Sequence, residues 1–295
     1  MTRSRPCALR KERGPAWPRA SRGLRRGPTA GRIRFPRGGQ RGTALDQVCP
    51  DVVVNCVGIV KQRPAARDAY LTVAINAYLP HLLAVRCAER GCRLLHISTD
   101  CVFSGARGGY VEGDPSDAQD LYGKSKHLGE TAPDETGSLT LRTSIVGREL
   151  QRPHHGLLEW FLASRGQTVR GFTRVLFTGL TTLELSRVVQ RIIDHHPTLC
   201  GLFHVAGPPI SKHDLLGRLR GAWDMDVEIR SDDGPVCDRS LVMGPFTAET
   251  GYTAPTWDAM IERLRHDPTP YDRWFPPDDG ARERPDDRLQ TRSSC

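Results

Sequence analysis

The chain lacks several features that define whole classes of protein. No uninterrupted run of 18 apolar residues occurs in its 295 residues, which argues against a membrane span. Its nine cysteines form no Cys-x-x-Cys pair, so neither a disulfide framework nor a zinc ribbon is indicated, and we expect a reducing, cytoplasmic compartment. The hydrophobic content of 38% excludes fibrous and fully disordered proteins. A globular protein with one large core is therefore expected.

Excess positive charge is missing from most of the chain, although the formal net charge is +8. Residues 1–44 carry 13 Lys plus Arg and one acid, Glu12, whereas the remainder carries a net charge of −4. A basic surface for nucleic acid or an anionic membrane is therefore not indicated for the body of the protein.

The two ends of the chain lack periodic patterning. Residues 1–44 mix Arg with Pro and Gly and show no helical or strand period, which predicts disorder. They contain no apolar segment typical of a secretory signal, and their Pro and Gly residues would break a presequence helix. Our interpretation is a non-native coding segment, with a basic RNA-binding arm as the alternative. Residues 276–295, rich in Pro and Asp, are predicted to be a disordered tail.

Strands and helices alternate from about residue 45 onward. A continuous apolar run typical of a buried parallel strand occupies residues 51–58, and further strands are expected over residues 93–98 and 139–146. Helices are expected over residues 71–90 and 121–132, with Pro80 tolerable only near a first turn or at a kink. This order predicts an α/β fold, a parallel sheet covered by helices on both faces.

Candidate catalytic groups follow the strand at 93–98. Thr99 and Asp100 lie where that strand ends, the edge at which open α/β sheets bind ligands. Tyr122 and Lys126 form a Tyr-x-x-x-Lys pair, and residues four apart lie on one face of a helix. We expect the ammonium to lower the pKa of the phenol, which would then act as an acid. The Thr99 hydroxyl could hold the carbonyl oxygen that Tyr122 protonates.

Together these motifs resemble the extended short-chain dehydrogenase/reductase superfamily, and within it the dTDP-4-dehydrorhamnose reductases and related sugar-nucleotide reductases. The resemblance covers residues 45–275. The segments that carry it are residues 50–58, 76–77, 98–105, 122–126, 129–130, 142–144, 201–206 and 211–216. It implies a Rossmann-like fold that binds NADP(H) or NAD(H) and a nucleotide-sugar substrate.

The resemblance also implies roles for individual residues. Thr99, Tyr122 and Lys126 would form the catalytic triad, in which Tyr122 protonates the 4-keto oxygen and Lys126 binds the nicotinamide ribose. The expected cofactor-binding residues are Cys56, Val57, Gly58, Tyr122 and Lys126. The expected substrate-binding residues are Thr99, Asp100, Ile145 and Arg239, the last of which suits phosphate oxygens.

Three departures from the family pattern are visible. Cys101 stands where the family usually has Tyr, and we interpret it as a small buried residue rather than a reactive thiol. Ile145 stands where an aromatic residue is usual. Residues 1–50 lack the Gly-x-x-Gly-x-x-Gly turn that holds a pyrophosphate, so the first strands of the sheet are expected to be absent or replaced. The strand at 51–58 would then form an exposed edge.

The sequence thus predicts a truncated Rossmann-like reductase domain over residues 45–275, with a small substrate lobe built from about 147–178 and 207–275. The expected reaction is NAD(P)H-dependent reduction of a nucleotide-linked 4-keto-sugar in polysaccharide precursor synthesis, impaired in this chain. The alternatives are an NAD-dependent sugar-nucleotide epimerase or dehydratase, and a non-catalytic binding subunit. A homodimer is considered, nucleic acid is not expected as a partner, and no metal site is expected, because the adjacent His pairs at 154–155 and 195–196 diverge.

Overall fold

A computed structural model describes residues 44–131, 136–150 and 154–271. The predictions for residues 1–43 and 276–295 therefore fall outside the described residues. In the first half of the chain the helices and strands are α1 (Ala44–Val48), β1 (Val52–Asn55), η1 (Pro64–Arg67), α2 (Ala69–Val73), η2 (Ala74–Tyr78), α3 (Leu79–Ala88), β2 (Arg93–Thr99), η3 (Asp100–Val102), α4 (Leu121–Leu128), β3 (Leu139–Thr143) and β4 (Ile145–Val146).

The second half adds shorter strands and the longest helix. Its elements are α6 (Leu157–Leu162), β5 (Thr168–Phe172), β6 (Val175–Phe177), β7 (Leu180–Thr181), α7 (Thr182–His195), β8 (Gly201–His204), β9 (Ile210–Ser211), α8 (Lys212–Ala222), β10 (Glu228–Asp232), β11 (Cys237–Asp238), α9 (Gly244–Thr250) and α10 (Trp257–Arg265).

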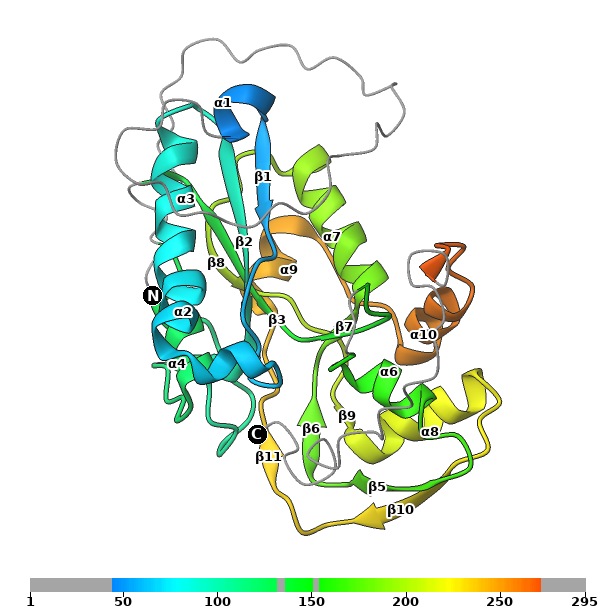
Figure 1. Ribbon diagram of the computed structural model, residues 1–295. Helices are drawn as coiled ribbons and strands as arrows, with labels where there is room; N and C mark the ends of the chain where they lie inside the picture. The colour runs from blue at the N-terminus through cyan, green and yellow to red at the C-terminus, as the bar shows by residue number, and fades with distance from the viewer. Residues whose placement is uncertain (1–43, 132–135, 151–153, 272–295) are drawn as a thin grey trace, which may run out of the picture.

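A four-stranded sheet in the order β1-β2-β3-β8 organises the first part of the molecule, and its strands all run parallel. Helices α2, α3 and α4 lie on one side of it and α7 on the other (Figure 1). The predicted parallel α/β fold is thus confirmed. Since parallel strands end at a common edge, the carboxyl ends of β1, β2 and β3 bring their following loops together.

The β1 strand has a hydrogen-bonded neighbour on one side only within the described residues, where it pairs with β2. Val54 in this strand is 39% exposed. The predicted loss of earlier strands concerns residues 1–43 and stays a prediction.

The helix expected over residues 71–90 contains a π-helical turn rather than a simple kink. A π-helical turn, η2, joins α2 to α3, and Pro80 falls in the first turn of α3, where its missing N–H is tolerated. Gly129, just after α4, lies against this turn so closely that a Cβ would come within 2.0 Å of the Asn76 carbonyl oxygen. The glycine thereby allows the end of α4 to approach η2.

The continuous helical stretch Ala69–Ala88 also bears on the membrane question. Among the described residues it is the one helix long and apolar enough to cross a membrane, by length and composition alone, with a mean hydropathy of 1.3. Polar residues within the stretch interrupt its apolar run, so the absence of an uninterrupted run did not predict this helix. The stretch packs against α4 and β2, and a helix in a protein core passes the same test.

Three small sheets follow the central sheet, and the first two of them form the lower part of the molecule in Figure 1. Their strand orders are β10-β5, β11-β6-β9 and β4-β7. Helices α8 and α10 pack together beside them, and the main hydrophobic core runs from β2 and β3 into these helices. The predicted substrate lobe corresponds to β5, β6, β9, β10, β11 and α8, and its boundaries stay a prediction.

Candidate active site

The end of β2 presents two buried polar side chains. Thr99 and Asp100 are each 7% exposed, at the junction of β2 with the short helix η3. The Thr99 hydroxyl accepts the backbone N–H of Cys101 at 3.1 Å and donates to the Asp100 carboxylate at 3.2 Å. Burial raises the pKa of Asp100, although the Arg239 charge and these hydrogen bonds oppose the shift. The local bonds fix both side chains at the sheet edge.

Helix α4 brings Tyr122 and Lys126 to the same edge. Asp120 caps its first turn by accepting the N–H of Gly123 at 2.7 Å. A Cβ at Gly123 would lie 2.1 Å from the Cys101 carbonyl oxygen, so only glycine permits this approach between α4 and η3. The predicted pair therefore depends on a glycine that the sequence argument assigned no role.

Tyr122 is half-buried beside Thr99, with which its hydroxyl forms a hydrogen bond. Burial raises its pKa above the ordinary value, and the nearby Cys101 and Asp100 add to the effect. The expectation that Lys126 lowers this pKa is thus wrong for the structure, because the Lys126 amine is directed elsewhere. A raised pKa keeps the phenol protonated at neutral pH, the form that a proton donor must have.

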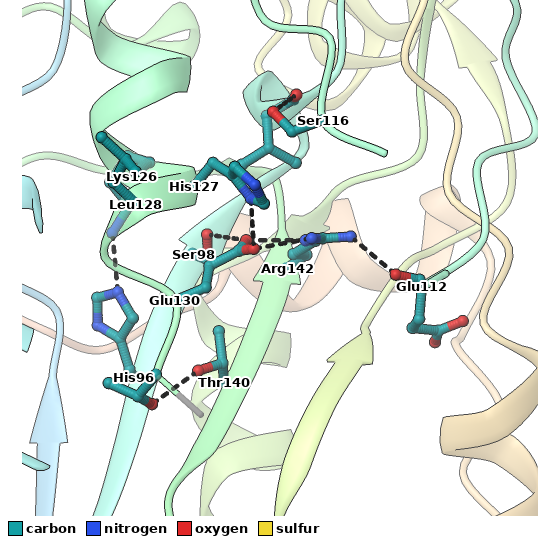
Figure 2. A network of polar contacts seen from close by, with 12 residues as sticks. His96, Ser98, Glu112, Ser116, Lys126, His127, Leu128, Glu130, Thr140 and Arg142 are labelled. Carbon is teal, nitrogen blue, oxygen red and sulfur yellow. Dashed lines mark hydrogen bonds and ion pairs between the residues drawn. The ribbon is translucent and has the colours of Figure 1, made fainter. Parts of the chain in front are cut away.

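Lys126 is only 4% exposed and points toward the strand below it (Figure 2). Its Nζ donates to the Ile97 carbonyl at 2.7 Å and lies 3.4 Å from Nε2 of His96. Burial lowers the pKa of Lys126 to about 8, while Glu130 and Cys56 oppose the shift. A charge change near neutral pH at this position suits a group that works with a proton donor.

A buried ion pair anchors the end of α4 to the sheet (Figure 2). Arg142 on β3 donates to both carboxylate oxygens of Glu130, at 2.8 and 2.7 Å, and Ser98 donates to the same carboxylate at 2.8 Å. Both side chains of the pair are less than a tenth exposed. Bidentate geometry of this kind fixes orientation. The sequence argument used these residues only as family markers and missed their contact.

The loop after β1 supplies the third side of the site. Cys56, Val57 and Gly58 are exposed there, and Val57 donates its N–H to the buried Asn55 side chain at 3.1 Å. The loop is also attached to the helix η2, because Asn76 accepts from the N–H of Ile59 at 2.8 Å and donates to its carbonyl at 2.9 Å. These side-chain bonds hold the loop beside Lys126.

One cavity of about 480 Å³ joins these elements. The residues proposed from the sequence that line it are Cys56, Val57, Gly58, Thr99, Asp100, Tyr122, Lys126, Ile145 and Arg239, the complete set. The structure thus brings every one of them together, from five separate segments of the chain. Their individual roles stay proposals.

The opposite wall of the cavity was not anticipated from the sequence. Lys212, at the start of α8, lines it and places its ammonium over the rings of Trp160 at 5.2 Å and Phe172 at 4.9 Å. Burial lowers the pKa of Lys212 to about 8, and the Arg170 charge adds to the effect. Arg148 lies on the same wall. The only sequence signal was a basic residue in a segment that resembles the family.

The three substituted or loosely matched positions behave differently from one another. Burial and the adjacent Asp100 raise the pKa of Cys101 to about 12, so its thiol stays protonated, as its interpretation as a small inert residue requires. Ile145 is 51% exposed on the cavity wall. Arg239 is 7% exposed, donates to the Phe103 carbonyl at 2.7 Å and contacts the Cys101 sulfur at 3.6 Å. Its guanidinium is therefore held beside Asp100 and Cys101.

A comparison with protein families now adds to this geometry. The model of the RmlD substrate binding domain matches residues 39–228. The chain belongs to this family. Similar proteins include the spore coat polysaccharide biosynthesis protein SpsK of Bacillus subtilis, 32% identical over 170 residues, which cover 55% of this chain and 56% of SpsK. A dTDP-4-dehydrorhamnose reductase of Burkholderia thailandensis is 39% identical over 105 residues, 35% of each chain. The chain thus matches about half of the length of SpsK, and less of the reductase.

Solved structures share the fold of the chain. The dTDP-4-dehydrorhamnose reductase of Bacillus anthracis, in complex with NADP, matches with a TM-score of 0.66 at 21% identity and covers 75% of this chain and 82% of its own. WbmG of Bordetella bronchiseptica, in complex with NAD, matches with a TM-score of 0.61 at 19% identity and covers 75% and 72%. Both the family and the fold are therefore those that the motifs indicated.

The residues at the cavity fit one end of a nicotinamide dinucleotide. The Lys126 amine uses one donor on the Ile97 carbonyl and keeps at least one further N–H whether it is charged or uncharged. The remaining donors, the Tyr122 hydroxyl and the exposed loop at 56–58 suit a ribose and a carboxamide. The described residues contain no glycine-rich turn between a strand and a helix for the pyrophosphate. The fit therefore concerns the nicotinamide end alone.

Proposed function

We propose that the protein reduces a nucleotide-linked 4-keto-sugar with NADPH or NADH, in the synthesis of a polysaccharide precursor in the cytoplasm. The observation that carries this proposal is the single cavity lined by Thr99, Tyr122 and Lys126 on one wall and by basic side chains on the other. The relatives named as reductases and as a polysaccharide biosynthesis protein support it.

The proposed reaction adds one hydride and one proton to the keto group of the substrate. A bound nicotinamide would supply the hydride to C4 of the sugar. Tyr122, held protonated by burial, donates its proton to the carbonyl oxygen as the C–O π bond breaks, and a hydroxyl group forms. Thr99 orients that oxygen through its hydroxyl. Lys126 holds the ribose, and solvent returns a proton to Tyr122 afterwards.

The basic wall supports a nucleotide diphosphate as the remote part of the substrate. Lys212, Arg148 and Arg239 all line the cavity, and the Arg148 guanidinium is paired with the Glu159 carboxylate at 2.6 Å. Phosphate oxygens would compensate the Lys212 charge, which no carboxylate in the described part of the chain approaches within 4 Å. Binding energy from such a remote group would position the keto carbon for reaction.

The proposal is tested by replacing Tyr122 with Phe. Removal of a positioned proton donor lowers turnover by roughly 10²–10⁴, and we expect KM to change little. NADPH oxidation with dTDP-4-dehydrorhamnose measures both constants. Tyr110→Phe is the matched control, because Tyr110 is a buried tyrosine that stacks on Phe103 and does not line the cavity. Wild-type turnover in Tyr122→Phe would remove Tyr122 from the chemical step.

The predicted impairment is tested separately by titrating the 1–295 chain with NADPH and following fluorescence. Each charge-assisted backbone hydrogen bond to a pyrophosphate contributes about 1.5–3 kcal/mol, so loss of a glycine-rich turn would weaken micromolar binding to the millimolar range. Micromolar binding would contradict the impairment. Tight binding without turnover of any 4-keto-sugar would favour the non-catalytic binding subunit.

A further inference from the structure

A chain of three buried side chains runs from the β1 loop to the site lysine. Asn55, His96 and Lys126 are 3%, 0% and 4% exposed and come from β1, β2 and α4. The Asn55 amide nitrogen lies 3.0 Å from Nδ1 of His96, and Nε2 of His96 lies 3.4 Å from Nζ of Lys126. Of these three residues, only Lys126 lines the cavity. Any influence of Asn55 and His96 on the reaction therefore passes through Lys126.

The hydrogen bonds assign the direction of each contact. The Asn55 amide oxygen accepts the N–H of Val57 at 3.1 Å, so its NH₂ group faces His96. The amide therefore donates to Nδ1, and a neutral imidazole must then carry its single proton on Nε2. That N–H points at Lys126, where it meets an acceptor only when the lysine is an uncharged amine. An ammonium would place two donors against each other.

The titratable groups around His96 and Lys126 shift the pKa values of these two residues in different directions. Burial lowers the pKa of His96 to about 3, the charges of Lys126 and of His81 on α3 add to the effect, and a hydrogen bond with the Asn55 backbone opposes it, so the ring is neutral across the working range. Lys126 faces Glu130, which follows the end of α4, and Cys56 from the β1 loop, and both favour the ammonium. Its lowered pKa therefore arises despite two neighbours that oppose it.

We propose that Asn55 and His96 are positioning residues for Lys126: Asn55 fixes the tautomer of His96, and the Nε2–H of His96 holds the uncharged lysine amine at the cavity wall. The inference rests on the proposed function for the use of Lys126 in the reaction. The arrangement itself is independent of substrate. The Val57 N–H holds the Asn55 amide in this orientation, because rotating the amide by half a turn would remove the oxygen that accepts this N–H.

The tautomer is read directly by ¹⁵N NMR of protein labelled at histidine, with the His96 signals assigned from a His96→Gln variant. We expect Nε2–H in the wild type at pH 9. The near-isosteric Asn55→Asp keeps the acceptor for Val57 but can only accept from Nδ1, so we expect its His96 to switch to Nδ1–H. A wild-type ring with its proton on Nδ1 would overturn the proposal without recourse to any variant.

The pKa of Lys126 is measured by competitive acetylation with acetic anhydride at a series of pH values, followed by mass spectrometry of each lysine. In Asn55→Asp, Nε2 becomes an acceptor for the ammonium, and we expect the pKa of Lys126 to rise by about one unit or more. Lys212 is the internal control, because its pKa is also lowered by burial and its ammonium lies over the rings of Trp160 and Phe172 rather than beside Asn55 and His96.

A double variant distinguishes an effect transmitted through His96 from the direct effect of the new carboxylate charge on Lys126. The Asn55→Asp substitution also adds a carboxylate, which raises the pKa of Lys126 through space whether or not His96 is present. In the His96→Gln background we therefore expect less than half of the shift, as a coupling through the imidazole requires. An equal shift in both backgrounds, or no shift in Asn55→Asp, would overturn the proposal. Neither result depends on turnover, so the proposed function stands or falls separately.

Discussion

Each wall of the cavity holds a buried ion pair, Glu130 with Arg142 and Glu159 with Arg148, but two charged groups on the walls differ in how they are compensated. On the sheet wall, formed by β2, β3 and α4, the Glu130 carboxylate is paired with Arg142 through two hydrogen bonds. On the lobe wall, formed by α6, β6 and the start of α8, the Lys212 ammonium rests on two aromatic rings, and the described residues offer it no carboxylate within 4 Å. A paired charge fixes geometry, whereas an uncompensated charge leaves its attraction available for an anion.

The space around individual glycines also differs between α4 and α8. Gly123 and Gly129 in the sheet wall stand where a Cβ would overlap with the backbone of a neighbouring element. Gly217, in the middle of α8, has nothing within 4 Å of an added Cβ. Gly123 and Gly129 thus allow close packing around Tyr122 and Lys126, while Gly217 has free space around it. Closely packed glycines also occur elsewhere, at Gly147 beside Thr182 and at Gly171 in β5 beside His213.

The largest expected effect comes from breaking the buried pair. Arg142→Met leaves the Glu130 carboxylate buried without its partner, and such a loss costs about 3–5 kcal/mol of unfolding free energy. Arg218→Met is the matched control on α8, because Arg218 pairs with Asp258 at the surface, with 43% and 72% of the two side chains exposed. Its loss should cost less than about 1 kcal/mol. Urea unfolding measures both, and similar losses would contradict the contrast between the walls.

A smaller effect is expected from a single methyl group. Gly123→Ala forces the Cys101 carbonyl away from α4, and overpacking of this kind costs about 1–3 kcal/mol. Because Tyr122 precedes the substituted residue, turnover should fall as well. Gly217→Ala, in open space on α8, should instead stabilise the protein by up to about 1 kcal/mol, since alanine is the better helix former. Thermal melts of both variants decide this, and losses of equal size would show that the walls pack alike.

A third effect depends on pH and concerns the lobe wall. The folded pKa of Lys212, about 8, lies below its ordinary value of 10.5, so the unfolded chain binds more protons between these values. The penalty on stability is complete below pH 8 and disappears as the pH rises toward 10.5, with a slope of at most about 1.4 kcal/mol per pH unit. Lys212→Met should therefore stabilise the protein at pH 7, and the gain should shrink between pH 8 and 10.

The Lys212→Met variant also carries a functional readout. Loss of the uncompensated ammonium should weaken inhibition by a nucleoside diphosphate while the protein becomes more stable, a trade-off typical of binding sites. Urea unfolding at pH 7 and pH 10, together with inhibition by dTDP, measures both sides. A variant that is less stable at pH 7 would show that the aromatic contacts outweigh the cost of burying the charge.

The local patterns in the sequence determined much of this protein. Apolar runs after Pro50 and around Leu95 predicted parallel strands because both faces of such strands are buried. The four-residue spacing of Tyr122 and Lys126 placed them on one face of a helix, since the α-helical period is a local property. Together with the strand-end position of Thr99, this was enough to collect the residues that line the cavity.

Only the tertiary structure decided how those residues are charged and held. The direction of the Lys126 amine depends on His96, thirty residues away, and on the Ile97 carbonyl, and no local pattern specifies such a contact. The raised pKa of Tyr122 follows from burial, which depends on how α4 packs on η3, through Gly123. The Lys212 charge faces the cavity because of the way α8 lies beside the aromatic rings. Spacing along the chain fixes which side chains share a face, but desolvation and partner choice depend on the packing of distant segments.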